Sequence, residues 1–191
     1  MIESDGLADR LRRETQQSHR DVEDARCLKG IFSSSFDLEG YRELMKRWRS
    51  FFVPIEEALT DVEVGDYRYR PRLPALADDL ASLQVPTPIS PHSSAASSLE
   101  GPWIPAGYEE AIGACYVIEG SCLGARLICR RLHEHLGPEV KSATNFYGIE
   151  FKQWRWFRQQ LDRVGEQAEI DGQRVVSGAR DCFRAIELHM D

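Results

Sequence analysis

Residues 108–135 read YEEAIGACYVIEGSCLGARLICRRLHEH and form the longest apolar stretch of the chain. The stretch predicts one long helix, closed by Gly137 and Pro138, because these residue types commonly end helices. Gly120 and Gly124 lie inside it. Two glycines in a helix interior cost roughly 2 kcal/mol relative to alanine, so we expect something to approach the backbone closely there. A second helix packed closely or a flat ligand lying across the helix would explain them.

Small residues continue this face of the predicted helix. Gly113 lies on it one heptad before Gly120, and Ser121 and Ala125 keep its flank small.

Cysteines form another stripe, with a repeat of seven residues. We expect them to be reduced core residues, as free cysteines usually are, and a thiolate metal site is the alternative. The chain has five cysteines and no C-x-x-C pair, which opposes a disulfide scaffold or zinc knuckle. The stripe consists of Cys115, Cys122 and Cys129.

The rest of the chain predicts further helices and gives little sign of strands. Residues 85–107 hold five prolines and five serines, which predicts a loop between helices. We therefore expect an all-α helical bundle forming a single domain over residues 1–191. The other expected helices run from Ser4 or Asp5 to Arg26, over 38–52 with Pro54 kinking the helix or opening a turn that ends near Thr60, from Pro71 or Pro74 to 83, and over 145–164 and 167–190.

Composition limits the classes of partner. The 191 residues carry a formal net charge of −7, whereas a nucleic-acid binder needs basic excess. No apolar run approaches the roughly 20 residues of a membrane span. The N-terminus is charged from its third residue, unlike a secretory signal. These features predict a cytoplasmic protein with no nucleic-acid partner and no membrane span.

A second segment carries a candidate metal ligand. Residues 11–23 read LRRETQQSHRDVE. At 100° per residue, Arg12, His19 and Glu23 fall within about 40° of one another on a helix. A carboxylate four residues past a histidine can hold one ring N–H, directly or through water, and so orient the other nitrogen toward a metal. A half-buried histidine at a helix edge, without any ligand, is the alternative.

Together the two segments resemble the heme oxygenase family, most closely its bacterial branch. L-R-x-x-T-x-x-x-H-x-x-x-E, from Leu11 to Glu23, is similar to the family's proximal helix. Y-V-x-E-G-S-x-L-G-A, from Tyr116 to Ala125, is similar to its distal helix. The resemblance implies an all-helical fold that holds heme between these two helices.

The resemblance also implies roles for individual residues. His19 would be the axial ligand of the heme iron. Gly120 and Gly124 would let the distal helix pass close over the porphyrin and leave room for O2. Ser121 stands where animal members carry an aspartate that organises distal water. Arg12 would pair with a heme propionate, and Tyr116 would lie near the propionates.

A later basic segment resembles the part of the family that supplies further propionate contacts. Residues 151–158 read FKQWRWFR. Lys152 matches the family's cation best, while Arg155 and Arg158 are possible partners without a matching position. Aromatic residues packed in the core and cations on a solvated face would also explain the segment.

The activity implied is cleavage of heme, both substrate and cofactor, by O2 and electrons to biliverdin, CO and Fe2+. Because the sequence has no dinucleotide, flavin or iron–sulfur motif, a reductase or ferredoxin would supply the electrons. The product would serve iron release or a bilin-accepting photoreceptor. The alternatives are a non-catalytic heme- or bilin-binding carrier and a helical interaction module without cofactor. A catalytic triad of Cys115 or Ser121 with His133 or His135 lacks a supporting motif.

Overall fold

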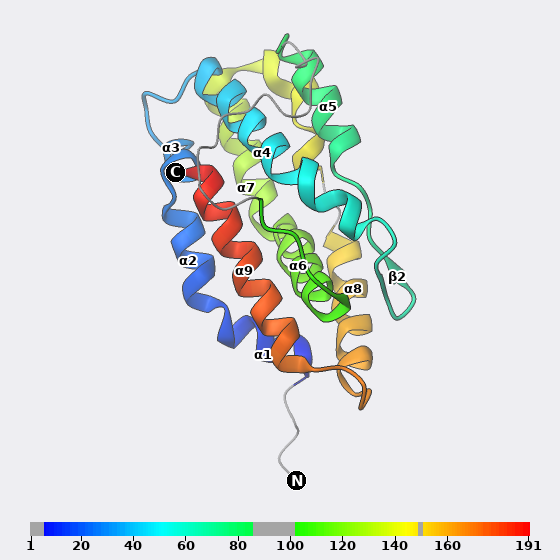
Figure 1. Ribbon diagram of the computed structural model, residues 1–191. Coiled ribbons are helices and arrows are strands. Elements are labelled where there is room, and N and C mark those ends of the chain that lie inside the picture. The colour runs from blue at the N-terminus through cyan, green and yellow to red at the C-terminus, as the bar shows by residue number, and fades with distance from the viewer. Residues whose placement is uncertain (1–5, 86–101, 149–150) are drawn as a thin grey trace.

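The computed structural model describes residues 6–85, 102–148 and 151–191, which are mostly helical with almost no strand, so the predicted all-α class is confirmed (Figure 1). Buried apolar side chains from most of these helices form one core cluster. Most of the predicted loop at 85–107 lies outside the described residues. The α-helices are α1 (Leu7–Glu14), α2 (Gln16–Asp24), α3 (Arg26–Gly30), α4 (Leu38–Leu59), α5 (Leu73–Ser82), α6 (Tyr108–Gly120), α7 (Cys122–Leu136), α8 (Phe151–Gly165) and α9 (Gly172–Met190).

Helix α6 is the centre of the core. Residues 111–119 are all buried, and α9 packs along the helix. Glycines bring the two backbones together: a Cβ on Gly113 would lie 2.2 Å from the carbonyl oxygen of Val175, and a Cβ on Gly178 would lie 2.4 Å from the α6 backbone. No methyl group fits at such distances. Gly113 therefore serves close helix packing, which is one of the two explanations that the sequence left open for the glycines of this segment.

The helix predicted over residues 108–135 is interrupted once, at Ser121, between α6 and α7. The Ser121 hydroxyl donates to the carbonyl oxygen of Ile118 at 2.7 Å. An unbroken α-helix would offer that acceptor to the N–H of Cys122. The N–H of Gly124 donates to the carbonyl oxygen of Ser121 at 3.1 Å, as in a tighter turn. The break thus falls directly after Gly120, within the segment bounded by the two glycines.

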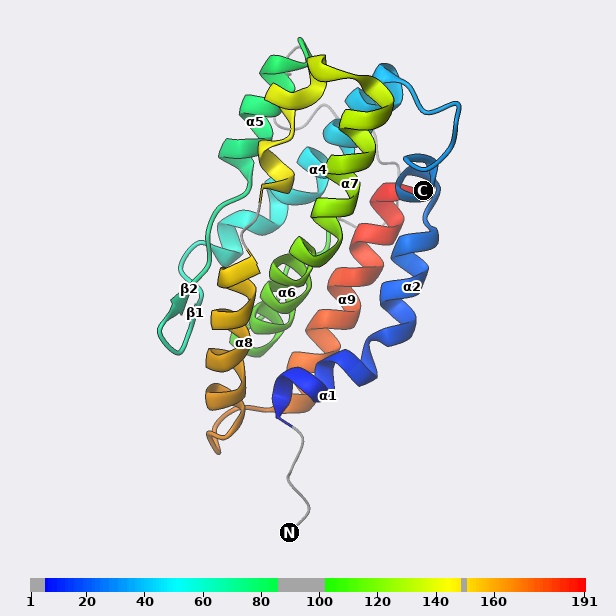
Figure 2. The same cartoon turned by 180° about the vertical axis from the view of Figure 1, so that it is seen from behind.

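The first predicted helix is divided into α1 and α2 at Thr15, and α3 follows from its expected end at Arg26 after an interruption at Ala25. Its expected start at Ser4 or Asp5 lies outside the described residues. The Thr15 hydroxyl donates to the carbonyl oxygen of Leu11 at 2.8 Å, and such bonds to the preceding turn bend helices. After the bend, α2 runs beside α9 (Figures 1 and 2).

Helix α4 continues through Pro54 as one element, begun by Asp37, whose side chain accepts from the N–H of Gly40 at 2.8 Å. The sequence did not predict the antiparallel hairpin of β1 (Glu63–Val64) and β2 (Tyr67–Arg68), because two-residue strands leave no alternating pattern. The expected helix at 145–164 begins later, as α8, after the 3-10 helices η1 (Pro138–Ala143) and η2 (Asn145–Tyr147).

One helical stretch of the described chain, Tyr108–Leu136, is long and apolar enough to cross a membrane by length and composition. Half of its most apolar window is buried inside the fold, against α9 among other elements. Central core helices pass the same test, so this finding is weak evidence for a membrane span.

Candidate functional site

The candidate metal ligand, His19, lies on α2, which has no fully buried residue. Its side chain is 58% exposed, and its ring meets the Phe183 ring of α9 edge-on, with 5.7 Å between centroids. Nδ1 lies 3.6 Å from Oε2 of Glu23, too far for a direct hydrogen bond but within reach through a water. No described residue bonds Nε2. That nitrogen is therefore available to a metal, and Glu23 is placed to orient the ring, as the spacing predicts.

A row of exposed apolar residues marks the start of α7. Leu123 is 57% exposed and Leu127 58%. A Cβ on Gly124 would have nothing within 4 Å, and a Cβ on Gly120 would meet only the Trp154 ring, at 3.5 Å. Helix packing therefore does not require glycine at position 124. The observation favours the other explanation given by the sequence, a ligand that approaches this face of the helix.

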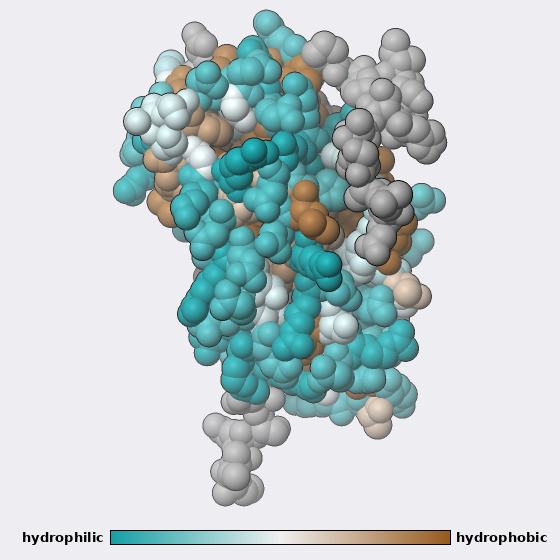
Figure 3. All heavy atoms as spheres, turned by 60° about the vertical axis from the view of Figure 1, so that its left-hand side comes forward, coloured by the Kyte–Doolittle hydropathy of each residue, from teal (hydrophilic) through white to brown (hydrophobic). Residues whose placement is uncertain are grey.

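These two features lie on either side of α9. Along the bundle, α2 and the α6–α7 pair flank α9 in both ribbon views (Figures 1 and 2). Figure 3 brings forward the side on which α2 lies, and hydrophilic side chains cover most of its lower half. The outward surface of α2 is thus solvated. His19 lies at its inner edge, where its ring contacts α9.

Tyr116, on α6, contacts residues of the neighbouring helices that border the site. Its side chain is mostly buried, and its ring centroid lies 5.5 Å from that of Trp154. Burial raises the pKa of Tyr116, while Arg158, a hydrogen bond with Thr15 and Arg12 act in the opposite direction. The phenol thus lies where α8, the Thr15 bend and α1 meet. Arg12 thus lies near enough to Tyr116 for its charge to act on the phenol, and the propionate roles that the resemblance implies for the two residues stay predictions.

The basic residues fall into two groups. Arg12, 79% exposed, borders a surface hollow and lies 3.8 Å from Asp9, which also pairs with Arg158 at 3.2 Å. Lys152 and Arg155 line a separate hollow on α8. At 100° per residue, Lys152 lies about 160° around α8 from the Trp154 that faces Gly120, and Arg158 only about 40°. The structure therefore places Arg158 beside Tyr116, and Lys152 and Arg155 farther around the helix.

Ser121 is exposed next to Gly120 at the helix break. Because its hydroxyl proton is donated to a backbone carbonyl, its oxygen remains free to accept a further hydrogen bond. The same bond opposes a nucleophilic role, since no imidazole receives the proton. His133 instead lies 3.2 Å from the Thr144 hydroxyl. The described residues offer no nucleophile and base pair of the triad type.

The cysteine stripe belongs to the core. Cys115 and Cys122 are buried and Cys129 is half-buried. Burial, followed by the negative charge of Glu119, raises the pKa of the Cys122 thiol to about 11. No group of three or more His, Cys, Asp or Glu side chains in the described residues could hold a metal ion. This arrangement is the one expected of reduced core cysteines.

Two residues at the site were missed in the sequence. Trp154 belongs to the buried stripe of α8 with Phe157 and Leu161, and that helical spacing was a usable signal. Phe183 contacts His19 from the other end of the chain, and no local pattern predicts that contact.

The residues present fit heme. His19 offers a free imidazole nitrogen, the usual axial ligand of heme iron. Leu123 and Leu127 offer an apolar surface to a flat ring, beside a glycine that leaves its approach open. Arg12 and Arg158 offer cations for carboxylates.

Comparison with known proteins agrees with this fit. The family model described as Heme oxygenase matches residues 5–188. The chain is also 28% identical, over 163 residues, to a protein named Heme oxygenase from Xanthomonas campestris pv. campestris (strain 8004). That match covers 82% of this chain and 92% of the relative.

Proposed function

Because the chain belongs to the heme oxygenase family, we propose that it is a monooxygenase that opens the heme ring with O2 and electrons, giving biliverdin, CO and Fe2+. The open space at Gly124, beside exposed Leu123 and Leu127, is the observation that carries the proposal. An apolar, glycine-lined face with no protein neighbour suits a ligand that is flat and apolar.

His19 binds the iron through Nε2 in this proposal. Glu23 accepts the Nδ1 proton through a water and so keeps one tautomer, with Nε2 unprotonated. Phe183 limits rotation of the imidazole because its ring edge lies against it. These residues fix the ligand before heme enters.

Bound heme supplies the redox-active iron and the carbon that is oxidised. Gly120 and Gly124 would keep the helix surface low beside the ring, which would leave room for O2. Leu123 and Leu127 exclude bulk water from the ring. Ser121 accepts a hydrogen bond from an ordered water at the helix break, since its own proton is already donated.

The cations orient the ring by holding its two propionates. Arg12 and Arg158 lie on either side of Asp9 and nearest Tyr116, so they are the first partners. Lys152 and Arg155 are exposed farther around α8 and contribute a wider positive field. Fixing the propionates fixes which edge of the ring faces the glycines, and hence which carbon is attacked.

The electrons come from a separate reductase or ferredoxin, since the sequence carries no motif for a second redox cofactor. We place the reaction in the cytoplasm, where the biliverdin releases iron or supplies a bilin-accepting photoreceptor.

The competing function is a heme or bilin carrier without turnover, which the free Nε2 and open face would also serve. The test adds hemin to the protein, then a reductant, with catalase present to remove free peroxide. The proposal expects loss of the Soret band and growth of a bilin band toward the red. A stable ferric or ferrous complex would instead identify a carrier, and no Soret band at all would identify an interaction module.

A variant pair tests the ligand. His19→Ala should abolish the normal coordination spectrum with little effect on folding, because the side chain is largely exposed. His135→Ala, at the far end of α7, should leave the spectrum unchanged. If His19→Ala retains the parent spectrum, the ligand assignment is wrong.

A further inference from the structure

A buried ion pair lies on the core side of the helix break. Nη2 of Arg72 donates to Oε1 of Glu119 at 2.5 Å. The side chain of Glu119 is fully buried and that of Arg72 is 9% exposed. Glu119 occupies the last turn of α6, directly before Gly120. The ion pair therefore acts on the end of the helix whose next residues face the ligand.

Arg72 is itself held from α4. The carboxylate of Glu56 accepts from the Tyr69 hydroxyl at 2.8 Å and from the N–H groups of Arg72 and Leu73 at 2.5 and 2.9 Å. These bonds fix the segment between the hairpin and α5. The hydrogen bonds that Glu56 accepts and the ion pair of Arg72 thus connect α4 to the end of α6.

Some polar atoms in and beside the ion pair lack a hydrogen-bond partner. Nε of Arg72, Oε2 of Glu119 and the hydroxyl of Tyr67 are buried and have no hydrogen-bond partner. Tyr67 faces the carboxylate, since burial and then the charge of Glu119 raise the pKa of its phenol. Buried polar atoms are normally satisfied, often by an ordered water with about three partners. The N–H of Arg72, the free carboxylate oxygen of Glu119 and the hydroxyl of Tyr67 would be three such partners for one water.

We propose that Arg72 and Glu119, with a buried water shared with Tyr67, position the heme-facing segment by fixing where α6 ends. The inference rests on the proposed function, because it concerns the helix that faces heme. Arg72 and Glu119 are positioning residues, since neither is on the exposed face with Leu123 and Gly124. A buried pair of charges is a poor source of stability compared with apolar residues of similar size, which is consistent with a positional role.

The main test replaces both charges, in the double variant Arg72→Met and Glu119→Leu. Apolar replacement of a buried pair often preserves folding. We expect the apo double variant to unfold cooperatively and to bind hemin through His19. The visible spectrum of its ferric hemin complex should change with pH, and the midpoint of that change should shift by at least ~0.5 pH unit from that of the parent. The reason is that the helix segment that faces the heme is no longer held in place by the ion pair. Its heme turnover should fall roughly tenfold.

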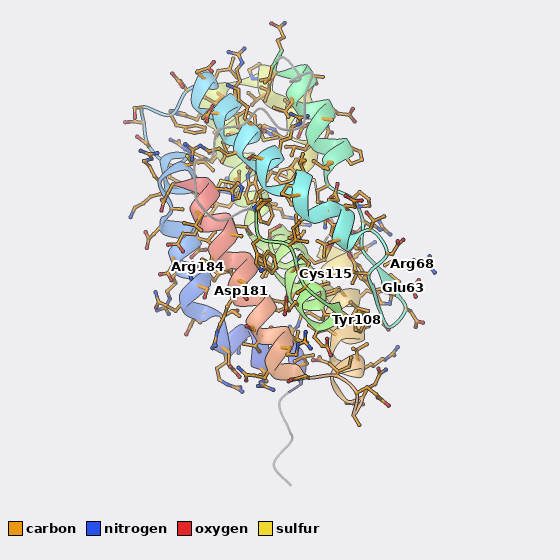
Figure 4. The ribbon with its side chains drawn as sticks, in the orientation of Figure 1. Glu63, Arg68, Tyr108, Cys115, Asp181 and Arg184 are labelled. Carbon is orange, nitrogen blue, oxygen red and sulfur yellow. The ribbon has the colours of Figure 1, made fainter. Side chains whose placement is uncertain are left out.

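A matched control breaks an exposed ion pair on the neighbouring hairpin. Nη2 of Arg68 lies 2.5 Å from Oε1 of Glu63, and both side chains are largely exposed. Figure 4 shows this pair at the outer edge of the hairpin, with Cys115 farther inside, on α6. Glu63→Gln should leave the midpoint and the turnover unchanged. An equal shift in this control would overturn the proposal.

Wild-type midpoint and turnover in a folded double variant would show that the pair is only structural. If the double variant does not fold, Tyr67→Phe, which removes the hydroxyl of the proposed water site and keeps both charges paired, decides by the same two readouts. Absence of turnover in the unaltered protein would refute the proposed function alone. The spectral midpoint would then still test the position of the helix.

Discussion

Replacing Gly124 with alanine should make the protein more stable and a worse heme binder. The added Cβ meets nothing within 4 Å, so the substitution gains helix propensity of about 0.5–1 kcal/mol without a clash. For a chain of this size the midpoint of thermal unfolding should rise by about 1–4 °C. The same methyl group projects where the heme ring must approach. Overpacking of about 1–3 kcal/mol corresponds to hemin binding weakened roughly 5- to 150-fold.

Gly113→Ala is the matched control, since the same change is made in the same long helical segment. Its Cβ would lie 2.2 Å from a backbone oxygen of α9, so the helices must move apart and the unfolding midpoint should fall by several degrees. The assays are thermal unfolding of the apo proteins and hemin titration followed at the Soret band. If Gly124→Ala binds hemin like the parent, or is destabilised like Gly113→Ala, no ligand approaches this face.

Three other outcomes follow from the geometry. Arg158→Ala should weaken hemin binding or change the ratio of biliverdin isomers more than Lys152→Ala, measured by titration and product chromatography; equal effects would contradict the placement of Arg158. Cys122 in the folded protein should resist iodoacetamide at pH 8, because a pKa of about 11 leaves roughly one thousandth of it as thiolate, and peptide mass spectrometry should detect alkylation only after denaturation. Asp79→Ala should lower the free energy of unfolding by about 1–3 kcal/mol, since it leaves the N–H groups at 145–146 without their buried acceptor, and a denaturant midpoint equal to the parent's would refute this role.

The helical class and the two motif helices could be predicted because their information is local. Apolar residues that recur with the helical period predict the buried face of a helix wherever they occur in the chain. The four-residue spacing of His19 and Glu23 within one helix brings the two side chains close together. The interruptions could not be read in the same way. The bend at Thr15 and the break at Ser121 depend on hydroxyls that turn back to carbonyls, a choice that tertiary packing decides.

The different roles of the glycines can be told apart only in the structure. Gly113 and Gly124 look alike in the sequence, as glycines inside one apolar helix. The structure places a neighbouring backbone against the first and nothing against the second. Similarly, the pairing of Arg72 with Glu119 joins residues far apart in the chain, and each alone is an ordinary charged residue.

Helix α9 packs against α2, which carries His19, and against α6, which ends at Gly120. The spacing between those two helices therefore depends on the side chains through which α9 contacts each of them. Changing the bulk of Phe183 would therefore alter that spacing and also the packing of the His19 ring, which Phe183 contacts. A library at buried positions of α9 other than Phe183 could thus yield forms that accept wider or narrower porphyrins while the contact with His19 is kept.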